Sequence, residues 1–241
     1  MDLLDPYARV ARLTPATFAM LPAILAAALL LPTDAPTWAK IVPLVIALGL
    51  PVFASQLVQD RGNAIQDRLW AGWGGPPTTQ LLRNADNPEP ERRDRRRADA
   101  VRVAGSDLTL PTPQQEIEDP AGADAEYAHA VGALRTRTRD RNAHPIVFSE
   151  NVAYGFRRNC LAIRPVALSI AGIVAIICIT TSLIIILAWR QVFGLGPGAW
   201  AFVAAMSALA WLIWWQIVTP DWVRQAAFRY AHALFDASSG L

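Results

Sequence analysis

The chain has 241 residues, of which 53% are hydrophobic and 17% charged, and its formal net charge is +2. This composition is too apolar for an ordinary soluble protein and excludes a soluble enzyme built on one core. Two cysteines are too few for a secreted disulfide scaffold. The composition therefore predicts an integral membrane protein.

Four segments carry no charged residue and are long enough to cross a membrane as helices: residues 13–33, 41–59, 166–189 and 191–220. The third would form a helix about 36 Å long, against about 30 Å for the hydrocarbon core of a bilayer. We therefore expect an all-α membrane protein with four transmembrane helices in two hairpins. Residues 1–59 form the N-terminal hairpin, residues 60–165 a mainly helical cytoplasmic insert, and residues 166–241 the C-terminal hairpin and tail.

The basic residues are distributed asymmetrically. Sixteen of the 22 lysines and arginines lie in the insert, whereas Lys40 and Arg190 alone lie in or beside the short connections between spans. By the positive-inside rule, this predicts a multi-pass membrane protein with both termini and the insert in the cytoplasm.

Within the insert, apolar residues at helical spacing extend the second span to Trp73, where Gly74 and Gly75 end the helix. The polar segment 84–99 predicts an exposed mobile loop or a solvated helix that contributes to no core. Thr112 and Gln115 form a capping-box pattern for a short helix that ends near Asp119.

Two further helices are expected in the insert. Tyr127, Ala130, Val131 and Leu134 form an apolar stripe on a helix that runs from about residue 124 toward residue 139. Ser149 is in a suitable position to cap a helix from residue 150, which leads through Pro165 into the third span.

No catalytic motif is evident. The three histidines are scattered, and no nucleophile, metal-ligand or phosphate-loop pattern occurs. None of the four spans contains an ionisable side chain, which proton-coupled or ion-coupled transporters usually need. We therefore expect no enzyme activity, no catalytic residue, no metal site and no cofactor.

The third span contains three consecutive hydroxyl side chains: Thr180, Thr181 and Ser182. They could line a pore, or they could bond to their own helix and to neighbouring helices, which is the commoner use in membranes. Four packed helices cannot enclose an ion path, so conduction requires a homo-oligomer, such as a tetramer, in the lipid bilayer.

Arginines alternate in RTRTRDR, where Arg135 and Arg139 would share one face of a helix. Arginine binds phosphate oxygens in a bidentate manner, and aromatic residues such as Trp73 supply stacking surfaces. The pattern favours a nucleotide or single-stranded nucleic acid as ligand. The alternative is that these arginines form salt bridges with the nearly equal number of acids, or contact lipid headgroups.

Three motifs carry a resemblance to known proteins: LWAGWGGPPTTQLLR at residues 69–83, TRD at residues 138–140 and ENVAYGFRRN at residues 150–159. They are similar to a recurrent family of small bacterial membrane proteins, some of which resemble the membrane effectors of Hailong-type antiphage defence. In those systems a nucleotidyltransferase makes short DNA oligomers that hold an oligomeric ion channel shut. The resemblance implies ligand or gating roles for Trp73, Gly74, Gly75, Thr78, Thr79, Arg83, Arg139, Asn151, Arg157 and Arg158.

With Arg135 added from the arginine pattern, these residues form the expected ligand site. The sequence thus favours a channel or pore-type effector that is gated by a nucleotide or oligonucleotide. The alternative is a membrane-anchored scaffold whose insert docks a cytoplasmic protein. The hydroxyl residues of the third span separate the two hypotheses, since a scaffold would tolerate alanine at all three positions.

Overall fold

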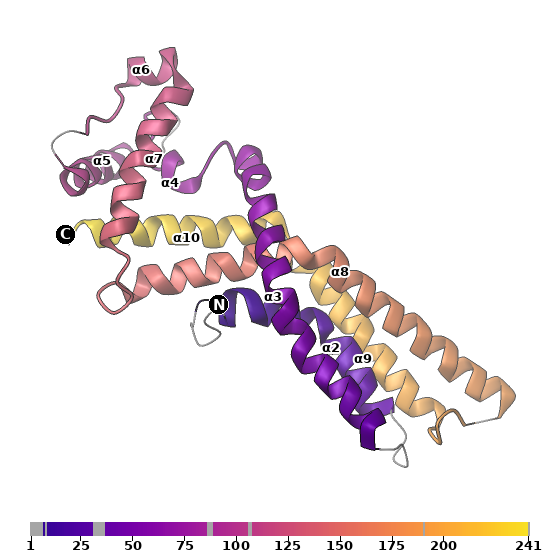
Figure 1. Ribbon diagram of the computed structural model, residues 1–241. Coiled ribbons are helices and arrows are strands. Elements are labelled where there is room, and N and C mark those ends of the chain that lie inside the picture. The colour runs from indigo at the N-terminus through magenta and orange to yellow at the C-terminus, as the bar shows by residue number, and fades with distance from the viewer. Residues whose placement is uncertain are drawn as a thin grey trace. The chain divides into compact units, whose positions relative to one another are not determined.

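The computed structural model describes residues 7, 9–30, 37–85, 89–105, 108–189 and 191–240, and it describes no side chains over residues 37–54. The described chain is helical and contains no β-strand (Figure 1). Packing divides the molecule into two compact units. We call Met1–Ile65 with Gly155–Trp222 the span unit, and Gln66–Tyr154 with Val223–Leu241 the head unit.

Long apolar helices build the span unit. A π-helical turn, Arg9–Leu13, leads into α2, Thr14–Leu30. The other helices that contribute are α3, Thr37–Trp73, α8, Pro145–Ala188, and α9, Pro197–Gln216. Pro22 and Pro165 lie inside α2 and α8, as membrane helices tolerate.

Among the described residues, three helical segments are long and apolar enough to cross a membrane: Arg9–Leu30, Pro145–Ala188 and Pro197–Ile217. The protein is therefore membrane-embedded, and the first, third and fourth predicted spans are found as candidates. The second predicted span, residues 41–59, lies in α3, but most of its side chains are outside the described residues. Four spans and two hairpins thus stay a prediction.

The core of the span unit is made largely of small side chains. Helix α2 packs against α9, and Ala16 and Ala19 contact a cluster that includes Cys160 and Trp214. Large apolar side chains point outward instead. Ile176, Ile186 and Leu187 on α8 are each more than half exposed. An outward-facing apolar surface is what a lipid environment permits.

Helix α7, Pro120–Arg137, lies at the centre of the head unit. Around it pack α4, Pro77–Gln80, α5, Pro90–Ala104, and α6, Pro113–Glu118 (Figure 1). The C-terminal helix α10, Pro220–Ser238, adds Leu234 and Phe235 to the same core. The predicted apolar stripe is confirmed, because Tyr127, Ala130, Val131 and Leu134 are all buried.

Helix ends in the head unit agree only in part with expectation. The capping box of α6 is confirmed, with Gln115 N donating to Thr112 Oγ1 at 3.3 Å and Thr112 N donating to Gln115 Oε1 at 2.9 Å. Helix α3 ends at Trp73, and Gly74 follows with a φ of 85°. The predicted cap at Ser149 is wrong. Helix α8 already begins at Pro145, a residue suited to a first helical position.

Most of residues 84–99 form the first part of α5, and none of them belongs to the apolar clusters of the described chain, which agrees with the expectation of a solvated helix. Arg96 is the exception, because it is buried. Ala100, just beyond this segment, joins the main head-unit cluster. The partner of Arg96 is His232 on α10, more than a hundred residues away in the sequence.

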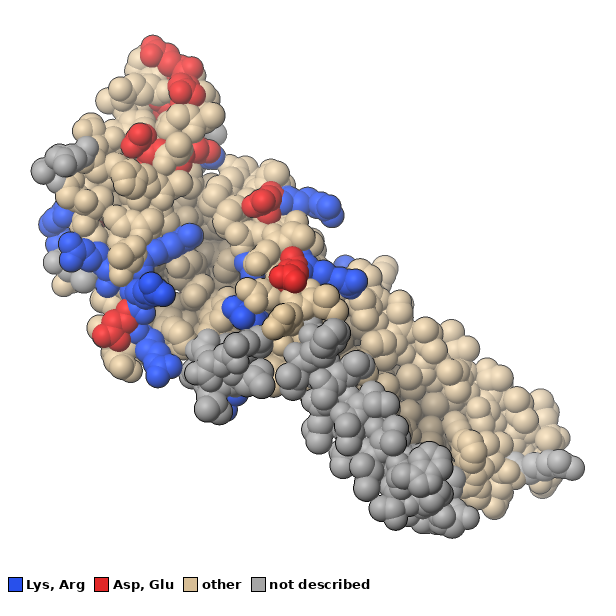
Figure 2. All heavy atoms as spheres, viewed as in Figure 1, with Lys and Arg blue, Asp and Glu red and all other residues tan. Residues whose placement is uncertain are grey.

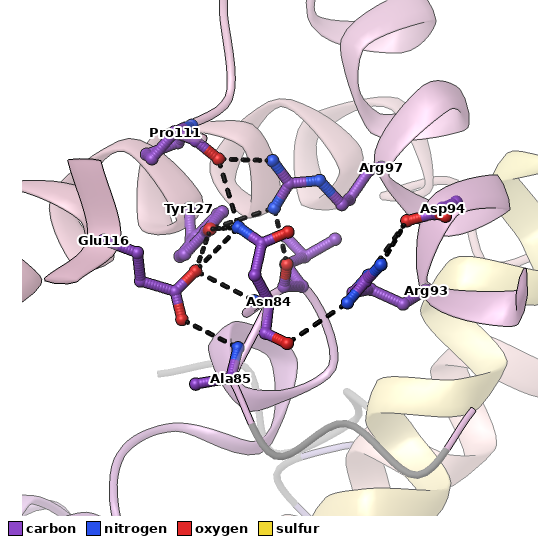
Figure 3. A network of polar contacts seen from close by, with 9 residues as sticks. Asn84, Ala85, Arg93, Asp94, Arg97, Pro111, Glu116 and Tyr127 are labelled. Carbon is purple, nitrogen blue, oxygen red and sulfur yellow. Dashed lines mark hydrogen bonds and ion pairs between the residues drawn. The ribbon is translucent and has the colours of Figure 1, made fainter. Parts of the chain in front are cut away.

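A buried polar network fixes the turn after α4 (Figure 3). The carboxylate of Glu116 accepts hydrogen bonds from Asn84 N at 2.8 Å, Ala85 N at 3.2 Å and Tyr127 Oη at 2.8 Å. Burial alone would raise the pKa of Glu116, but these hydrogen bonds outweigh it and lower the pKa. Arg97 closes the network by donating to the carbonyls of Leu82 and Pro111.

Candidate functional site: an arginine groove in the head unit

Two adjoining hollows lie where α5 meets α10 and the end of α3, with volumes of about 550 and 500 Å³. They share Arg92, Arg96 and His232, so we describe them together as the arginine groove. The first is lined by Trp73, Gly74, Gln80, Leu81, Arg83, Ala85, Glu89, Arg92, Arg96, Phe228 and His232. The second is lined by Arg92, Arg95, Arg96, Asp99, His232, Phe235, Asp236 and Ser239.

Arg96 is a buried cation shared by both hollows, with 8% of its surface exposed. Its Nη2 lies 3.2 Å from His232 Nδ1 and 3.8 Å from a carboxylate oxygen of Glu89. Since a guanidinium only donates, Nδ1 must accept, which requires a neutral imidazole. Burial lowers the pKa of Arg96, and burial together with the charge of Arg96 lowers the pKa of His232.

The other charges of the groove leave room for an anion. Glu89 pairs with Arg92 at 3.0 Å, and Asp99 pairs with Arg102, which is outside the groove, at 2.6 Å. Arg95 is exposed and forms no ion pair with any described residue. Arg92, Arg95 and Arg96 therefore line this space together with the carboxylates of Glu89, Asp99 and Asp236, and Arg95 is the arginine among them that pairs with no described carboxylate.

The segment from Gly74 to Arg83, which follows α3 and includes α4, forms one wall of the groove. Arg83 donates from Nη1 to the carbonyl of Gly74 at 2.5 Å, and Gln80 Nε2 donates to the carbonyls of Trp73 and Gly75 at 2.9 and 2.6 Å. Gly75 has a φ of 121°, and a Cβ there would lie 2.8 Å from Arg83 Nη2. Both the positive φ and the close approach require glycine.

The residues predicted to bind ligand fall into separate places. Trp73, Gly74 and Arg83 line the groove. Thr78 and Thr79 are buried in the adjoining turn, while Arg135 and Arg139 are exposed at and beyond the end of α7. Half-buried Asn151 lies on α8 within the head unit, and Arg157 and Arg158 belong to the span unit. The arrangement thus selects three of the predicted residues for one site.

The three hydroxyl residues of the predicted pore differ in environment. Thr180 is exposed and Thr181 half-buried on α8. Ser182 is buried and donates a hydrogen bond from Oγ to the carbonyl of Pro197 at 3.0 Å. Ser182 therefore ties α8 to the start of α9, which leaves Thr180 as the hydroxyl that faces outward from a single copy.

Two arginines of the span unit lie over tryptophan rings. Arg157 Nη1 donates to the carbonyl of Trp222 at 2.9 Å, and its guanidinium lies 4.8 Å from the centre of that ring. Arg164 makes the same pair of contacts with Trp215, at 3.0 and 5.2 Å. Both contacts combine a cation–π interaction with a hydrogen bond to a backbone carbonyl. The carbonyl of Trp215 lies in the last turn of α9, where a positive charge also interacts favourably with the helix dipole.

Sequence reasoning missed His232, Phe228 and Asp236 as residues of this groove. They lie on α10, which we treated only as a tail. A signal was present, because Val223, Ala226, Ala227, Ala231 and Leu234 follow a helical spacing and are all buried. That stripe predicts a helix with one packed face. His232 lies next to this face and is therefore close to the elements that pack against it.

Comparison with known proteins adds no further assignment. No protein-family model, curated protein or solved structure matches the chain.

Proposed function

We propose that the protein is a homo-oligomeric effector of the bacterial inner membrane, whose head unit binds a nucleotide or a short single-stranded DNA oligomer. The ligand occupies the arginine groove and sets whether a pore built from α8 and α9 of several copies is open. The observation that carries the proposal is the groove, where buried Arg96 lies near Trp73 and Phe228. A role in antiphage defence, with a nucleotidyltransferase that makes the ligand, is proposed from the sequence resemblance.

Each part of such a ligand has a partner in the groove. Phosphate oxygens suit Arg92 and Arg95, whose planar guanidinium groups can donate two parallel hydrogen bonds. A base can stack on Trp73 or Phe228. Glu89 holds Arg92 in the empty groove. An entering phosphate must displace this carboxylate, so Glu89 acts as an internal competitor.

The walls of the groove offer a route from ligand to pore. They come from α5, from the end of α3 and from α10. Helix α10 begins at Pro220, shortly after the last candidate span ends at Ile217. A ligand can shift a gate only by binding one of its states more tightly. We therefore propose that the ligand draws α5 and α10 together in one of the two states of the gate, and that the population of this state determines whether the pore is open.

The first experiment uses the full chain purified in mild detergent without nuclease. The 260 to 280 nm absorbance ratio and mass spectrometry of the denatured sample would identify a bound nucleotide. A labelled short single-stranded DNA then measures affinity by fluorescence anisotropy. Arg92→Ala and Arg95→Ala should each weaken binding by about tenfold, and Glu89→Gln should strengthen it.

Arg68→Ala is the matched control, because Arg68 is also an exposed helical arginine of the head unit but does not line the groove. If about three phosphates are contacted, the logarithm of affinity should fall with the logarithm of salt concentration with a slope of about −2. If the wild-type protein purifies without ligand, and if it and all four variants bind the labelled DNA equally weakly, the proposal is contradicted and the scaffold hypothesis is favoured.

A further inference from the structure

A second groove, with an apolar wall, lies beside α6 and shares Arg83 and Ala85 with the lining of the arginine groove. It has a volume of about 500 Å³, and its apolar wall consists of Pro113, Ile117 and Pro120. Ile117 is 74% exposed, a high value for an isoleucine in the head unit. An isolated exposed apolar residue needs no explanation, but one that lines a groove is a candidate for contact with a partner.

The unpaired charges beside this groove are negative, because the two arginines that line it, Arg83 and Arg93, are paired with Asp124 and Asp94. Glu118, Asp119 and Glu126 are exposed, and none of them forms an ion pair within the described chain. Asp124 lines the groove as well but is engaged by Arg83. Figure 2 shows acidic side chains gathered on the end of the head unit where α6 lies. We call the groove and these carboxylates the acidic end.

The opposite end of α7 has the complementary character. Arg135, Arg137, Arg139 and Arg141 are exposed there, and none is ion-paired with another described residue. Just beyond them Ile146, in the first turn of α8, is 69% exposed. We call these five residues the basic end. Each end of the helix therefore presents one exposed isoleucine within a group of like charges.

The charges alone have a simpler explanation. Acids at the start of a helix and arginines at its finish both interact favourably with the helix dipole. This explanation does not cover the two exposed isoleucines or the apolar groove around one of them. It also does not explain why four arginines within seven residues remain unpaired although their like charges repel each other.

We propose that the head units of neighbouring copies bind head to tail, with Ile146 of one copy in the Pro113–Ile117–Pro120 groove of the next. The arginines of the basic end then face the carboxylates of the acidic end. A second copy fits as the occupant, because the basic end of the same chain supplies both the complementary charge and an exposed isoleucine. The two ends of one copy cannot meet, since α7 has 18 residues and separates them by about 27 Å. Such a contact between unlike patches closes into a ring or continues as a chain.

Disulfide trapping in native membranes tests this arrangement on the full chain. The background is Cys160→Ala with Cys178→Ala, two buried positions, and Ile117→Cys and Ile146→Cys are introduced at exposed sites that folding tolerates. Ile117→Cys alone and Ile146→Cys alone should remain monomeric after oxidation. Co-expression of the two single variants should give a dimer and nothing larger. The double variant should give a ladder of linked chains.

Ala128→Cys is the matched control, because Ala128 is exposed in the middle of α7; combined with Ile146→Cys it should not cross-link. Strong homodimers from either single variant, or no ladder from the double variant, would overturn the proposal. Charge exchange adds a second readout. Glu118→Arg and Arg139→Glu should each lower the ladder yield by about tenfold, and the two together should restore it. Arg139→Glu should leave nucleotide affinity unchanged, which separates this contact from the proposed ligand site.

Discussion

The guanidinium of Arg83 holds the carboxylate of Asp124 at two points, with Nε 2.8 Å from Oδ1 and Nη2 2.5 Å from Oδ2. The hydrogen bond with Asp124 raises the pKa of Arg83. The same guanidinium donates to the carbonyl of Gly74. One side chain therefore fastens the glycine turn after α3 to the start of α7, and it does so at the wall of the arginine groove.

Arg83→Lys should loosen this turn although the charge is kept, because a lysine ammonium cannot span both carboxylate oxygens and the Gly74 carbonyl. The pair is partly exposed, so we expect a loss of about 1 kcal/mol in the stability of the head unit. Hydrogen exchange at residues 74–80 should become faster. Unchanged exchange there would show that the turn is held by its other contacts.

Gly62→Ala should destabilise the span unit by about 1–3 kcal/mol, because the added Cβ would collide with Asn159 Oδ1. Asn159 cannot move away easily, since its Nδ2 donates to the carbonyl of Ala11 at 2.6 Å. Gly72→Ala in the same helix is the control. Nothing lies within 4 Å of its Cβ position, so better helix propensity should stabilise α3 by about 1 kcal/mol. Thermal unfolding in detergent measures both; equal shifts would contradict the prediction.

The stability of the head unit should decrease as the pH falls below 6.5. The ordinary pKa of a histidine is 6.5. Burial, together with the charges of the nearby Arg96 and Arg92, lowers the pKa of His232, and the charges of Asp236 and Glu89 oppose this lowering. The unfolded chain therefore takes up the proton first, and the contribution of neutral His232 is complete above 6.5 and lost below it. His232→Gln keeps an acceptor for Arg96 and should flatten this pH dependence. His129→Gln, on the exposed face of α7, should not.

A second acidic transition should come from Glu116. Its pKa is held below the ordinary value of 4.5, so its contribution is complete above 4.5 and is lost as the pH falls through the lowered value. Glu116→Gln should remove this transition and cost about 1–3 kcal/mol at neutral pH, because the amide nitrogen cannot accept the bonds that the carboxylate accepts. Melting temperature as a function of pH checks both effects. Glu118→Gln, on the exposed side of α6, serves as the reference.

Two of the three hydroxyl residues of the predicted pore, Ser182 and Thr180, should respond differently to mutation. Ser182→Ala should lower stability by about 1 kcal/mol, since the Pro197 carbonyl loses its donor. Thr180→Val should leave stability unchanged, because Thr180 is exposed. If Thr180 lines a pore between copies, the same change should reduce ion flux in proteoliposomes by about tenfold. Unaltered flux in a conducting wild-type preparation would remove Thr180 from the pore.

Local signals in the sequence predicted local structure well. The apolar stripe of α7, the capping box at Thr112 and the end of α3 at Gly74 each depend on residues within a few turns of one another. Membrane insertion was equally predictable from the sequence, because the length of an apolar segment decides whether it can cross a bilayer. The predicted cap at Ser149 was wrong because Pro145 and Ser149 are both suitable positions for the start of a helix, and α8 begins at the earlier one, Pro145.

The arginine groove was only partly predictable. Trp73, Gly74 and Arg83 came from a motif, but Arg96 meets His232 across 136 residues of sequence. The polar segment around Arg96 looked solvated because its partners lie on α10. Their contact is tertiary, and no periodicity within α5 reveals which of its many arginines is covered.

The two arginines of the span unit that lie over tryptophan rings, Arg157 and Arg164, differ in what they imply for the dependence of the protein on lipid. Arg164 places its charge at the carbonyl end of α9, next to Trp215. Arg157 does not act in this way, because Trp222 lies in the first turn of α10. The negative pole of the α9 helix dipole is thus met by a counter-charge that the protein itself supplies. We therefore expect the end of α9 to be as stable in a zwitterionic bilayer as in an anionic one, because its counter-charge is part of the chain.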